Sequence, residues 1–343
     1  MGCVHCNASW CWRAGAADDA DETGYHPYAK ALVTAKYNPE THVLDFGTPI
    51  IRSDNDVTQR LKKVYVPRFY LDTYQALQAC TDVHFHGGAF VVGSPGTGKA
   101  VMRNVHAWCI ANAMKLDTGA REVKILFATH NGRQEWVRAI LVVLTRDTDG
   151  RIQAEAVEHD DFMKIKLSQH DYVLAYFTNG YARDAFPALW LKARLWGYSD
   201  PVMTLAVRRT LPDHVLYTPN VWPVEELVLA ATVLDLTIPP LVHHFKEVSE
   251  VGLKDQEARI RNRAELFGGV PGVCLETDPK RAAKYASVFI RSCLNVTDST
   301  IWSERGYNLH QTVVYLVTRW PPERWYSLGT HAPLSHLTLV CPV

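Results

Sequence analysis

"VVGSPGTGKAVMRN", residues 91–104, is the most informative stretch of this chain. An apolar run precedes a glycine-rich turn and a helical pattern follows it, which is the context that a phosphate-binding loop requires. Glycine is needed there because successive backbone N–H groups must turn inward around one anion, beside the positive end of a helix. Lys99 then adds a point charge for the terminal phosphates. The residues expected to bind the nucleotide are Gly93, Ser94, Pro95, Gly96, Thr97, Gly98, Lys99 and Ala100.

Two features of this region indicate nucleotide binding with little hydrolysis. Ala100 stands where such loops carry Ser or Thr, whose hydroxyl coordinates Mg²⁺. A second metal-handling acid is expected at the end of a neighbouring strand, but the best-placed strand, "DYVLAYFTNG", ends at Asn179, an amide without the charge of Asp. Because Mg²⁺ neutralises charge during phosphoryl transfer, hydrolysis should suffer more than binding. Asp171 opens that strand at the wrong end and is interpreted as a cap or a surface acid.

From about residue 86, short apolar runs alternate with helical patterns, as in the crossover units of a parallel sheet. We expect a three-layer α/β fold of the P-loop NTPase type, with a parallel sheet and a helical C-terminal extension. Tyr70, Tyr74, Leu77 and Cys80 recur at helical spacing and predict a helix that leads into the sheet. The expected strands are 87–93, 123–129, 138–145, 171–177, 201–207 and 214–218.

These patterns divide the chain into four segments. Residues 1–24 end in a run of small and acidic residues, which predicts an exposed tail. Residues 25–85 form a lead-in that contains the first helix, and residues 86–222 form the P-loop NTPase core. Residues 223–343 form the helical extension, which opens with a Pro and two acids at a helix start and includes a late strand at 311–318.

The composition is that of an ordinary globular protein and gives no strong sign of nucleic-acid binding. Of 343 residues 47% are hydrophobic, and 36 basic residues balance 36 acidic ones, so no net field favours a polyanion. The most apolar long window, 224–242, contains three acids and a Pro pair and fails as a membrane span. Eight cysteines, mostly single and within apolar runs, favour a reducing compartment, and the first residues lack a secretory signal. We therefore expect an intracellular protein, cytoplasmic or nuclear.

Four stretches together resemble the P-loop ATPase module of crinkler-type effectors and of the related trypanosomatid retrotransposon hot spot proteins. The order and spacing of these stretches agree with that family from about residue 66 to residue 275. They are "FYLDTYQALQAC" followed by "VVGSPGTGKA", then "DYVLAYFTNG", "VLYTPNVWPVEEL" and "RNRAELFGGVPG".

The resemblance implies an ATP-binding domain that in relatives often precedes a nuclease-like or kinase-like toxin domain, in proteins sent into host cells or nuclei. This chain departs from the pattern at Ala100, at Asn179, and at Gly272, which stands where the relatives carry Arg. We also expect the leader segment and the toxin domain of typical crinklers to be missing. These departures weaken the case for activity and secretion more than the case for the fold.

The preferred hypothesis is that ATP acts as a conformational ligand in an effector-like or regulatory protein with an unknown protein partner. The first alternative is a competent ATPase in which Asp160 or Asp161 replaces the missing metal ligands. The second alternative is a non-enzymatic interaction scaffold whose loop is vestigial.

The N-terminus suggests a separate possibility. Gly2, Cys3 and Cys6 resemble the acylated start of Src-family kinases, with myristate on the Gly and palmitate on the cysteines, which would anchor the chain to a membrane. Cys3, His5, Cys6 and Cys11 are an alternative but cramped zinc set. An unmodified tail is the default expectation.

Other residues have a structural explanation at least as good as a functional one. Trp222 is interpreted as a core aromatic next to a helix start. Residues 267–271 are interpreted first as a tight turn, and only second as a nucleotide-sensing element. Arg208 and Arg209 are equally a solvated pair or phosphate ligands. His84 and His86 lack a third ligand, so no metal site is predicted.

Overall fold

The structure, a computed structural model, describes most of the chain between residues 25 and 294. The described ranges are 25–51, 61–83, 88–93, 96–117, 119–131, 135–159, 165–178, 192–199, 215–217, 222–242 and 249–294, with two short strands at 316–317 and 338–339.

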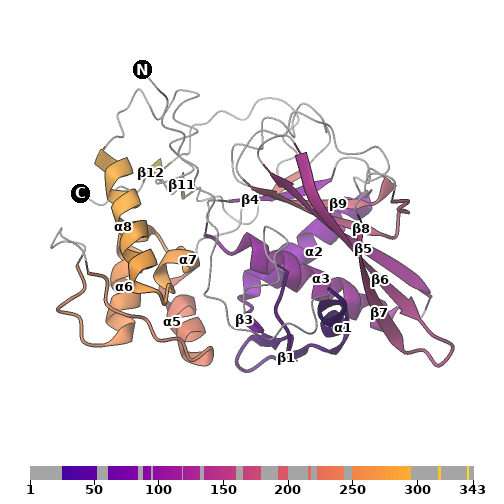
Figure 1. Cartoon of the computed structure of the whole chain (residues 1–343), viewed down its shortest axis with the longest axis horizontal. Coiled ribbons are helices and arrows are strands. Elements are labelled where there is room, and N and C mark those ends of the chain that lie inside the picture. The colour runs from indigo at the N-terminus through magenta and orange to yellow at the C-terminus, as the bar shows by residue number, and fades with distance from the viewer. Residues whose placement is uncertain are drawn as a thin grey trace, which may run out of the picture.

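A seven-stranded mixed sheet forms the centre of the α/β fold, with the strand order β10-β4-β9-β8-β5-β6-β7 (Figure 1). The five strands from β10 to β5 are parallel, whereas β6 and β7 form an antiparallel meander at one edge. The strands are β4 (Ala89–Val92), β5 (Glu122–Asn131), β6 (Glu135–Arg146), β7 (Ile152–His159), β8 (Tyr172–Thr178), β9 (Arg194–Ser199) and β10 (Val215–Tyr217). The sheet is therefore mostly parallel.

The prediction of a wholly parallel sheet is wrong at this edge. The expected strand at 138–145 exists as β6, but it pairs antiparallel with β5. Only residues 132–134 connect the two strands, and a parallel pairing needs a crossover of a dozen or more residues. Strand β7 follows through the turn at 147–151 and was not predicted.

The expected strands at 87–93, 123–129, 171–177 and 214–218 are confirmed, and the one at 201–207 lies outside the described residues. Strand β9, the neighbour of β4, was missed. Its sequence "RLWGYS" contains Gly197, which reads as a strand breaker. In the sheet this glycine pairs with Phe90, and a Cβ on it would lie 2.1 Å from the Phe90 ring. Close ring packing therefore requires the glycine.

Helices α1 (His26–Thr34), α2 (Arg68–Val83) and α3 (Lys99–Leu116) lie on one face of the sheet (Figure 1). Helix α2 confirms the predicted helix. Helix α3 ends where the Arg146 guanidinium donates to the carbonyls of Met114 and Asp117. The opposite face carries a second buried cluster that includes Phe90, Leu126, Val173, Leu195 and the loop residues Ile165 and Leu167. Within the described residues helices cover one face, so the third layer stays a prediction.

The lead-in segment also contains a small antiparallel sheet of β1 (Lys36–Asn38), β2 (Val43–Asp45) and β3 (Lys63–Tyr65). Asn104 of α3 ties this region to the core. Its Oδ1 accepts from the Tyr28 hydroxyl at 2.6 Å, and its Nδ2 donates to the Ile51 carbonyl at 2.5 Å.

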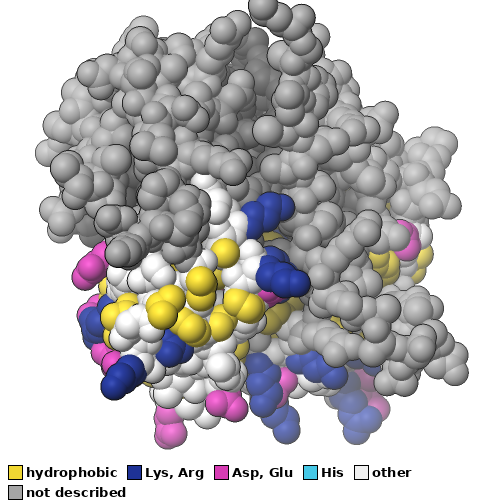
Figure 2. Space-filling view, turned by 60° about the vertical axis from the view of Figure 1, so that its left-hand side comes forward, with side chains coloured by type: hydrophobic (Ala, Val, Ile, Leu, Met, Phe, Trp, Pro, Cys, Tyr) yellow, Lys and Arg dark blue, Asp and Glu magenta, His cyan; other side chains and the backbone are white. Residues whose placement is uncertain are grey.

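The described residues between 223 and 294 contain four helices and lie to one side of the sheet (Figure 1). The helices are α5 (Val224–Val233), α6 (Gln256–Phe267), α7 (Pro271–Cys274) and α8 (Pro279–Leu294), and we call them the helical part. β11 (Leu316–Val317), inside the expected late strand, pairs antiparallel with β12 (Thr338–Leu339). Figure 2 shows the helical part from its outer side, where hydrophobic side chains form a band next to Lys and Arg side chains. Within the described part of the chain, no helix combines the length and hydrophobicity needed to cross a bilayer.

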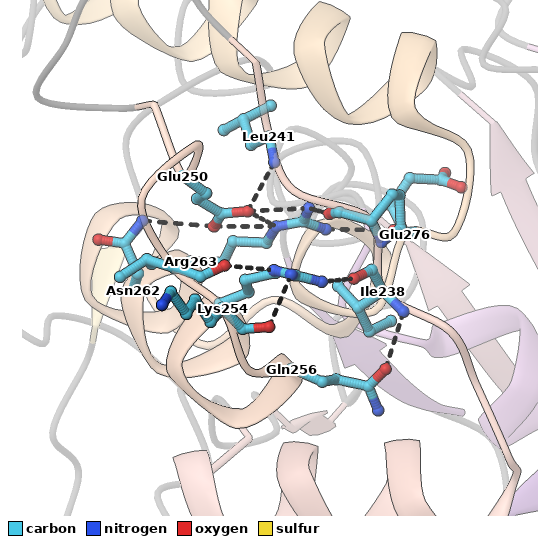
Figure 3. Close-up of polar contacts among 11 residues, drawn as sticks. Ile238, Leu241, Glu250, Lys254, Gln256, Asn262, Arg263 and Glu276 are labelled. Atoms are coloured by element: carbon cyan, nitrogen blue, oxygen red, sulfur yellow. Dashed lines mark hydrogen bonds and ion pairs between the residues drawn. The ribbon is translucent and has the colours of Figure 1, made fainter.

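A buried ion pair fixes the segments between these helices (Figure 3). The Arg263 guanidinium donates to both carboxylate oxygens of Glu250, at 3.1 to 3.2 Å, and to the Glu276 carbonyl at 3.1 Å. Glu250 also accepts from the Leu241 amide at 2.8 Å. Arg263 and Glu250 are both fully buried, so each charge depends on the other for its stabilisation.

This pair predicts a large effect of removing one charge. Arg263→Met leaves the Glu250 carboxylate buried and unpaired, and we expect it to lower the free energy of unfolding by about 3–5 kcal/mol. Arg261→Met, which removes an exposed arginine from the same helix, should leave stability nearly unchanged in urea titrations. Equal effects of the two substitutions would contradict the assigned role of the buried pair.

A second prediction concerns pH and comes from His106, a residue of α3 that is buried against α2 and β9. Its Nε2 lies 2.9 Å from the Tyr70 carbonyl, which only accepts, so Nε2 carries the proton and Nδ1 accepts from the Tyr198 hydroxyl at 2.8 Å. Burial lowers the pKa of His106 from 6.5 to about 3. The unfolded chain therefore takes up a proton near pH 6.5 that the folded chain refuses until near pH 3.

The contribution of His106 to stability is thus complete above pH 6.5 and declines, by about 1.4 kcal/mol per pH unit, as pH falls toward 3. Urea unfolding between pH 7 and pH 4 should show a shallower decline for His106→Gln than for the wild type. His170→Gln, at an exposed histidine, serves as the control. Identical slopes for His106→Gln and the wild type would exclude this role.

Candidate functional site

The loop between β4 and α3 lies at the carboxyl edge of the parallel strands. Gly93 continues β4, and its N–H donates to the Ser199 carbonyl at the end of β9, at 3.1 Å. Gly96 and Gly98 adopt φ angles of +82° and +92°, in the region that side chains disfavour. Ser94 and Pro95, also predicted phosphate ligands, lie outside the described residues. The strand, glycine turn and helix thus follow in the predicted order.

Lys99 is the first residue of α3 and reaches back across the loop. Its Nζ donates to the Gly93 carbonyl at 2.6 Å, and the residue is 3% exposed. Ala100 follows on the helix, with its carbonyl accepting from Asn104 Nδ2 at 2.7 Å. The Ala100 methyl offers no oxygen to a metal ion. The ammonium therefore joins the two ends of the loop while the metal-binding hydroxyl is missing.

The carbonyl groups of the two positive-φ glycines bind groups outside the loop. The Gly98 carbonyl accepts from the Tyr70 hydroxyl at 3.2 Å and from the Met102 amide at 2.9 Å. The Gly96 carbonyl accepts from the Gly272 amide at 3.0 Å. A Cβ at position 98 would lie 2.2 Å from Tyr70 Oη, and one at position 96 would lie 2.9 Å from Val270 Cγ1. Both glycines are therefore required by contacts as well as by backbone conformation.

An aromatic cluster supports the loop from α2 and from the segment before α5. Trp222 packs against the rings of Tyr65, Phe69 and Tyr70, with ring centroids 5.8 to 6.1 Å apart. Burial raises the pKa of Tyr70, so its hydroxyl stays protonated and donates. Tyr65 donates to Glu226 in the first turn of α5. The interpretation of Trp222 as a core residue is confirmed, and the core at this point adjoins the loop.

The turn at 268–272 meets both the aromatic cluster and the loop. The backbone N–H of Trp222 donates to the Gly269 carbonyl at 3.2 Å, and a Cβ on Gly269 would lie 2.5 Å from the Trp222 carbonyl oxygen. The stretches "VLYTPNVWPVEEL" and "RNRAELFGGVPG", far apart in the sequence, therefore converge on the glycine loop.

Asn179 follows directly after β8 and lies outside the described residues. The expectation that its strand neighbours β4 is wrong, because β9 lies between the two. At ordinary strand spacing β8 is about 10 Å from β4. Asp160 and Asp161 are also outside the described residues, and β7, the strand before them, lies five positions from β4, about 24 Å away by the same spacing.

Asp171 is a cap, which confirms the first of its two interpretations. It is buried, so the second interpretation, a surface acid, is wrong. Its carboxylate accepts from the amides of Lys124 and Ser168, at 2.8 and 2.6 Å, and from the Ser168 hydroxyl. These bonds fix the amino-terminal end of β8, opposite the glycine loop.

Several predicted candidates lie outside the described residues: the tail with Gly2, Cys3, His5, Cys6 and Cys11, the pair His84 and His86, and the pair Arg208 and Arg209. Among the residues that the structure describes, no group of three His, Cys, Asp or Glu side chains could hold a metal ion. Burial raises the pKa of the Cys109 and Cys274 thiols to about 12, which makes both poor nucleophiles.

Two residues at the loop were missed as site residues. Tyr70 was recognised only through helical periodicity, and Gly272 only as a departure from Arg in the family pattern. Their positions within the stretches that carry the resemblance were the available signal.

Comparison of the sequence with protein-family models and with curated proteins finds no match. The resemblance to crinkler and hot spot proteins therefore remains a prediction that rests on the four stretches.

The contact between Gly98 and Tyr70 makes a double-mutant prediction. Gly98→Ala combines a positive φ with a clash against the Tyr70 hydroxyl, whereas Gly47→Ala has a positive φ of +68° with no atom within 4 Å. We expect Gly98→Ala to reduce the free energy of unfolding by about 2 kcal/mol more than Gly47→Ala.

Tyr70→Phe should return part of that difference, because the nearest ring carbon, Cζ, would lie 3.5 Å from the new methyl group, an ordinary contact distance. Chemical unfolding of the single and double variants measures this coupling. Strict additivity of the Gly98 and Tyr70 changes would exclude the contact.

Proposed function

We propose that this chain binds ATP through residues 93–99, with weak or no hydrolysis, and that the nucleotide acts as a conformational ligand. One observation carries the proposal: a strand, a turn with two positive-φ glycines and a helix are closed by a buried lysine whose Nζ lies 2.6 Å from the Gly93 carbonyl. A glycine turn before a helix N-terminus, with a lysine at the helix start, is typical of loops whose backbone N–H groups and one positive charge meet a phosphate.

The place of the loop in the sheet supports a P-loop NTPase fold. Strand β4 lies between β9 and β10, and the chain reaches both of these strands only after building β5 to β8 on one side. Ligands of open parallel sheets bind at such a switch point, outside the carboxyl ends of the strands. Helix α3 begins there without a side-chain cap on its first amides, which favours an anion at its N-terminus.

The choice of ATP over other phosphate ligands rests on the resemblance to the crinkler and hot spot modules. The same resemblance supports an effector-like or regulatory role, in which a protein partner reads the nucleotide state. Membrane anchoring through acylated Gly2, Cys3 and Cys6 is a separate proposal.

Weak hydrolysis follows from the chemistry of the site. Ala100 lacks the hydroxyl, and Asn179 lacks the charge, that would hold Mg²⁺ against the phosphates. The distance of β7 from β4 also disfavours the alternative in which Asp160 or Asp161 supplies the missing charge.

Equilibrium binding of a fluorescent ATP analogue tests this function. We expect saturable binding with the wild type and a loss of about a hundredfold in affinity with Lys99→Ala, which removes the charge on the terminal phosphates. Lys115→Ala, at the far end of the same helix, is the control.

Phosphate release separates the alternatives. The wild type should show little turnover with Mg²⁺, and Ala100→Ser should increase the effect of Mg²⁺ on binding by restoring the hydroxyl. Wild-type turnover that Lys99→Ala abolishes would support the competent ATPase instead. If no saturable binding is found at millimolar nucleotide, only the hypothesis of a non-enzymatic interaction scaffold remains.

A further inference from the structure

The outward carbonyl groups of the glycine loop determine where its N–H groups point. A trans peptide is planar and directs its C=O and its N–H to opposite sides, and the described residues contain no cis peptide bond. The Gly96 carbonyl points to the Gly272 amide, so the N–H of Thr97 in the same peptide points the other way. The Gly98 carbonyl points to Tyr70 Oη and the Met102 amide, so the N–H of Lys99 points back toward the loop.

The contact between Gly96 and Gly272 is a backbone contact that leaves no room for a side chain. A Cβ on Gly272 would lie 3.0 Å from Gly96 Cα and 3.1 Å from the Gly96 carbonyl oxygen. The absence of a side chain at position 272 therefore permits the 3.0 Å hydrogen bond between the two segments. A bulkier residue would have to separate the helical part from the loop.

Gly272 is held in place by its own surroundings. Gly268, with φ of +73°, ends α6, and its amide donates to the Ala264 carbonyl at 2.9 Å. Gly269, with φ of +70°, packs against the Trp222 backbone, and the Val270 carbonyl accepts from the amide of Cys274 at 2.9 Å. The position of the Gly272 amide thus follows from the docking of α6 and Trp222.

The two groups that bind the loop carbonyls, the Gly272 amide and the Tyr70 hydroxyl, are connected through Trp222. Tyr70 packs against Trp222 with ring centroids 6.0 Å apart, and Trp222 binds Gly269 through its backbone. A shift of the helical part would therefore act on both the Gly272 and the Tyr70 contacts with the loop.

We propose that the helical part completes the phosphate site, with Gly272 and Tyr70 as positioning residues for the Thr97 and Lys99 amides. The proposal rests on the ATP binding proposed above and adds its regulation. A loop whose amides are already oriented loses less freedom when it binds an anion, so docking of the helical part strengthens nucleotide binding. By linkage, nucleotide strengthens docking by the same factor, and a partner that displaces the helical part would release the nucleotide.

Gly272→Val and Tyr70→Phe test this coupling in the full chain, with the fluorescent ATP analogue and ATP as probes. Gly272→Val forces the two backbones apart, and we expect binding to weaken by about tenfold or more. Tyr70→Phe removes one hydrogen bond and should weaken binding by about threefold to tenfold. Gly252→Val is the matched control, because Gly252 is exposed and a Cβ added there would have no atom within 4 Å. This variant should bind ATP as the wild type does.

Hydrogen exchange gives the readout that a purely structural role would not move. ATP should slow amide exchange in residues 256–275 of the wild type and of Gly252→Val, and this protection should be lost in Gly272→Val. If Gly272→Val fails to unfold cooperatively, Gly272→Ala replaces it, since that change requires Gly96 to shift by a few tenths of an ångström.

Unchanged affinity in a folded Gly272 variant, with ATP protection of 256–275 retained, would overturn the coupling and leave ATP binding intact. Failure of the wild type to bind ATP at all is a different result, because it overturns the proposed function and the coupling together.

Discussion

The rest of the structure around the loop depends on two positions, Gly96 and Gly98, at which neighbouring elements leave no space for a side chain. Gly96 and Gly98 turn the chain between β4 and α3 through positive φ angles, and their would-be Cβ positions are already filled by Val270 and Tyr70. A larger residue at either position would move α2 or the 268–272 turn, not only the loop. The glycine loop is therefore a junction of the sheet, the lead-in helix and the helical part, as well as a candidate ligand site.

Sequence patterns predicted the β4-loop-α3 unit, helix α2 and four of the sheet strands, because local periodicity and glycine spacing are written in consecutive residues. They failed where the cause is tertiary. Strand β9 was not predicted, because Gly197 interrupts its pattern, although the Phe90 ring on the neighbouring strand requires a glycine there. Without β9, the strand that precedes Asn179 was taken for a direct neighbour of β4, although β9 lies between the two. The roles of Tyr70 and Gly272 depend on contacts across 28 residues and across more than 170 residues, which no local pattern encodes.

Buried polar groups define the surroundings of the site in two different ways. His106 is kept neutral between the Tyr70 carbonyl and the Tyr198 hydroxyl, so the helix that carries Lys99 is fixed without an additional charge. Arg263 and Glu250 instead bury both charges and bind backbone groups of the segments around α6. Such a network tolerates little rearrangement, because each partially broken state leaves a charge without compensation. The helical part is therefore suited to move as a unit.

The pairing of Phe90 with Gly197 also sets the alignment of two strands along their length. The ring lies over the only position of β9 that has no side chain, and the neighbours of that position are the bulky Trp196 and Tyr198. A slip of one residue would press the ring against an indole or a phenol and turn the buried side chains of β9 to the opposite face. The pair thus fixes the register of β4 against β9, and with it the position of the end of β4 relative to Ser199. In related sequences the two positions should change together, a bulky residue on one strand matched by a small one on the other.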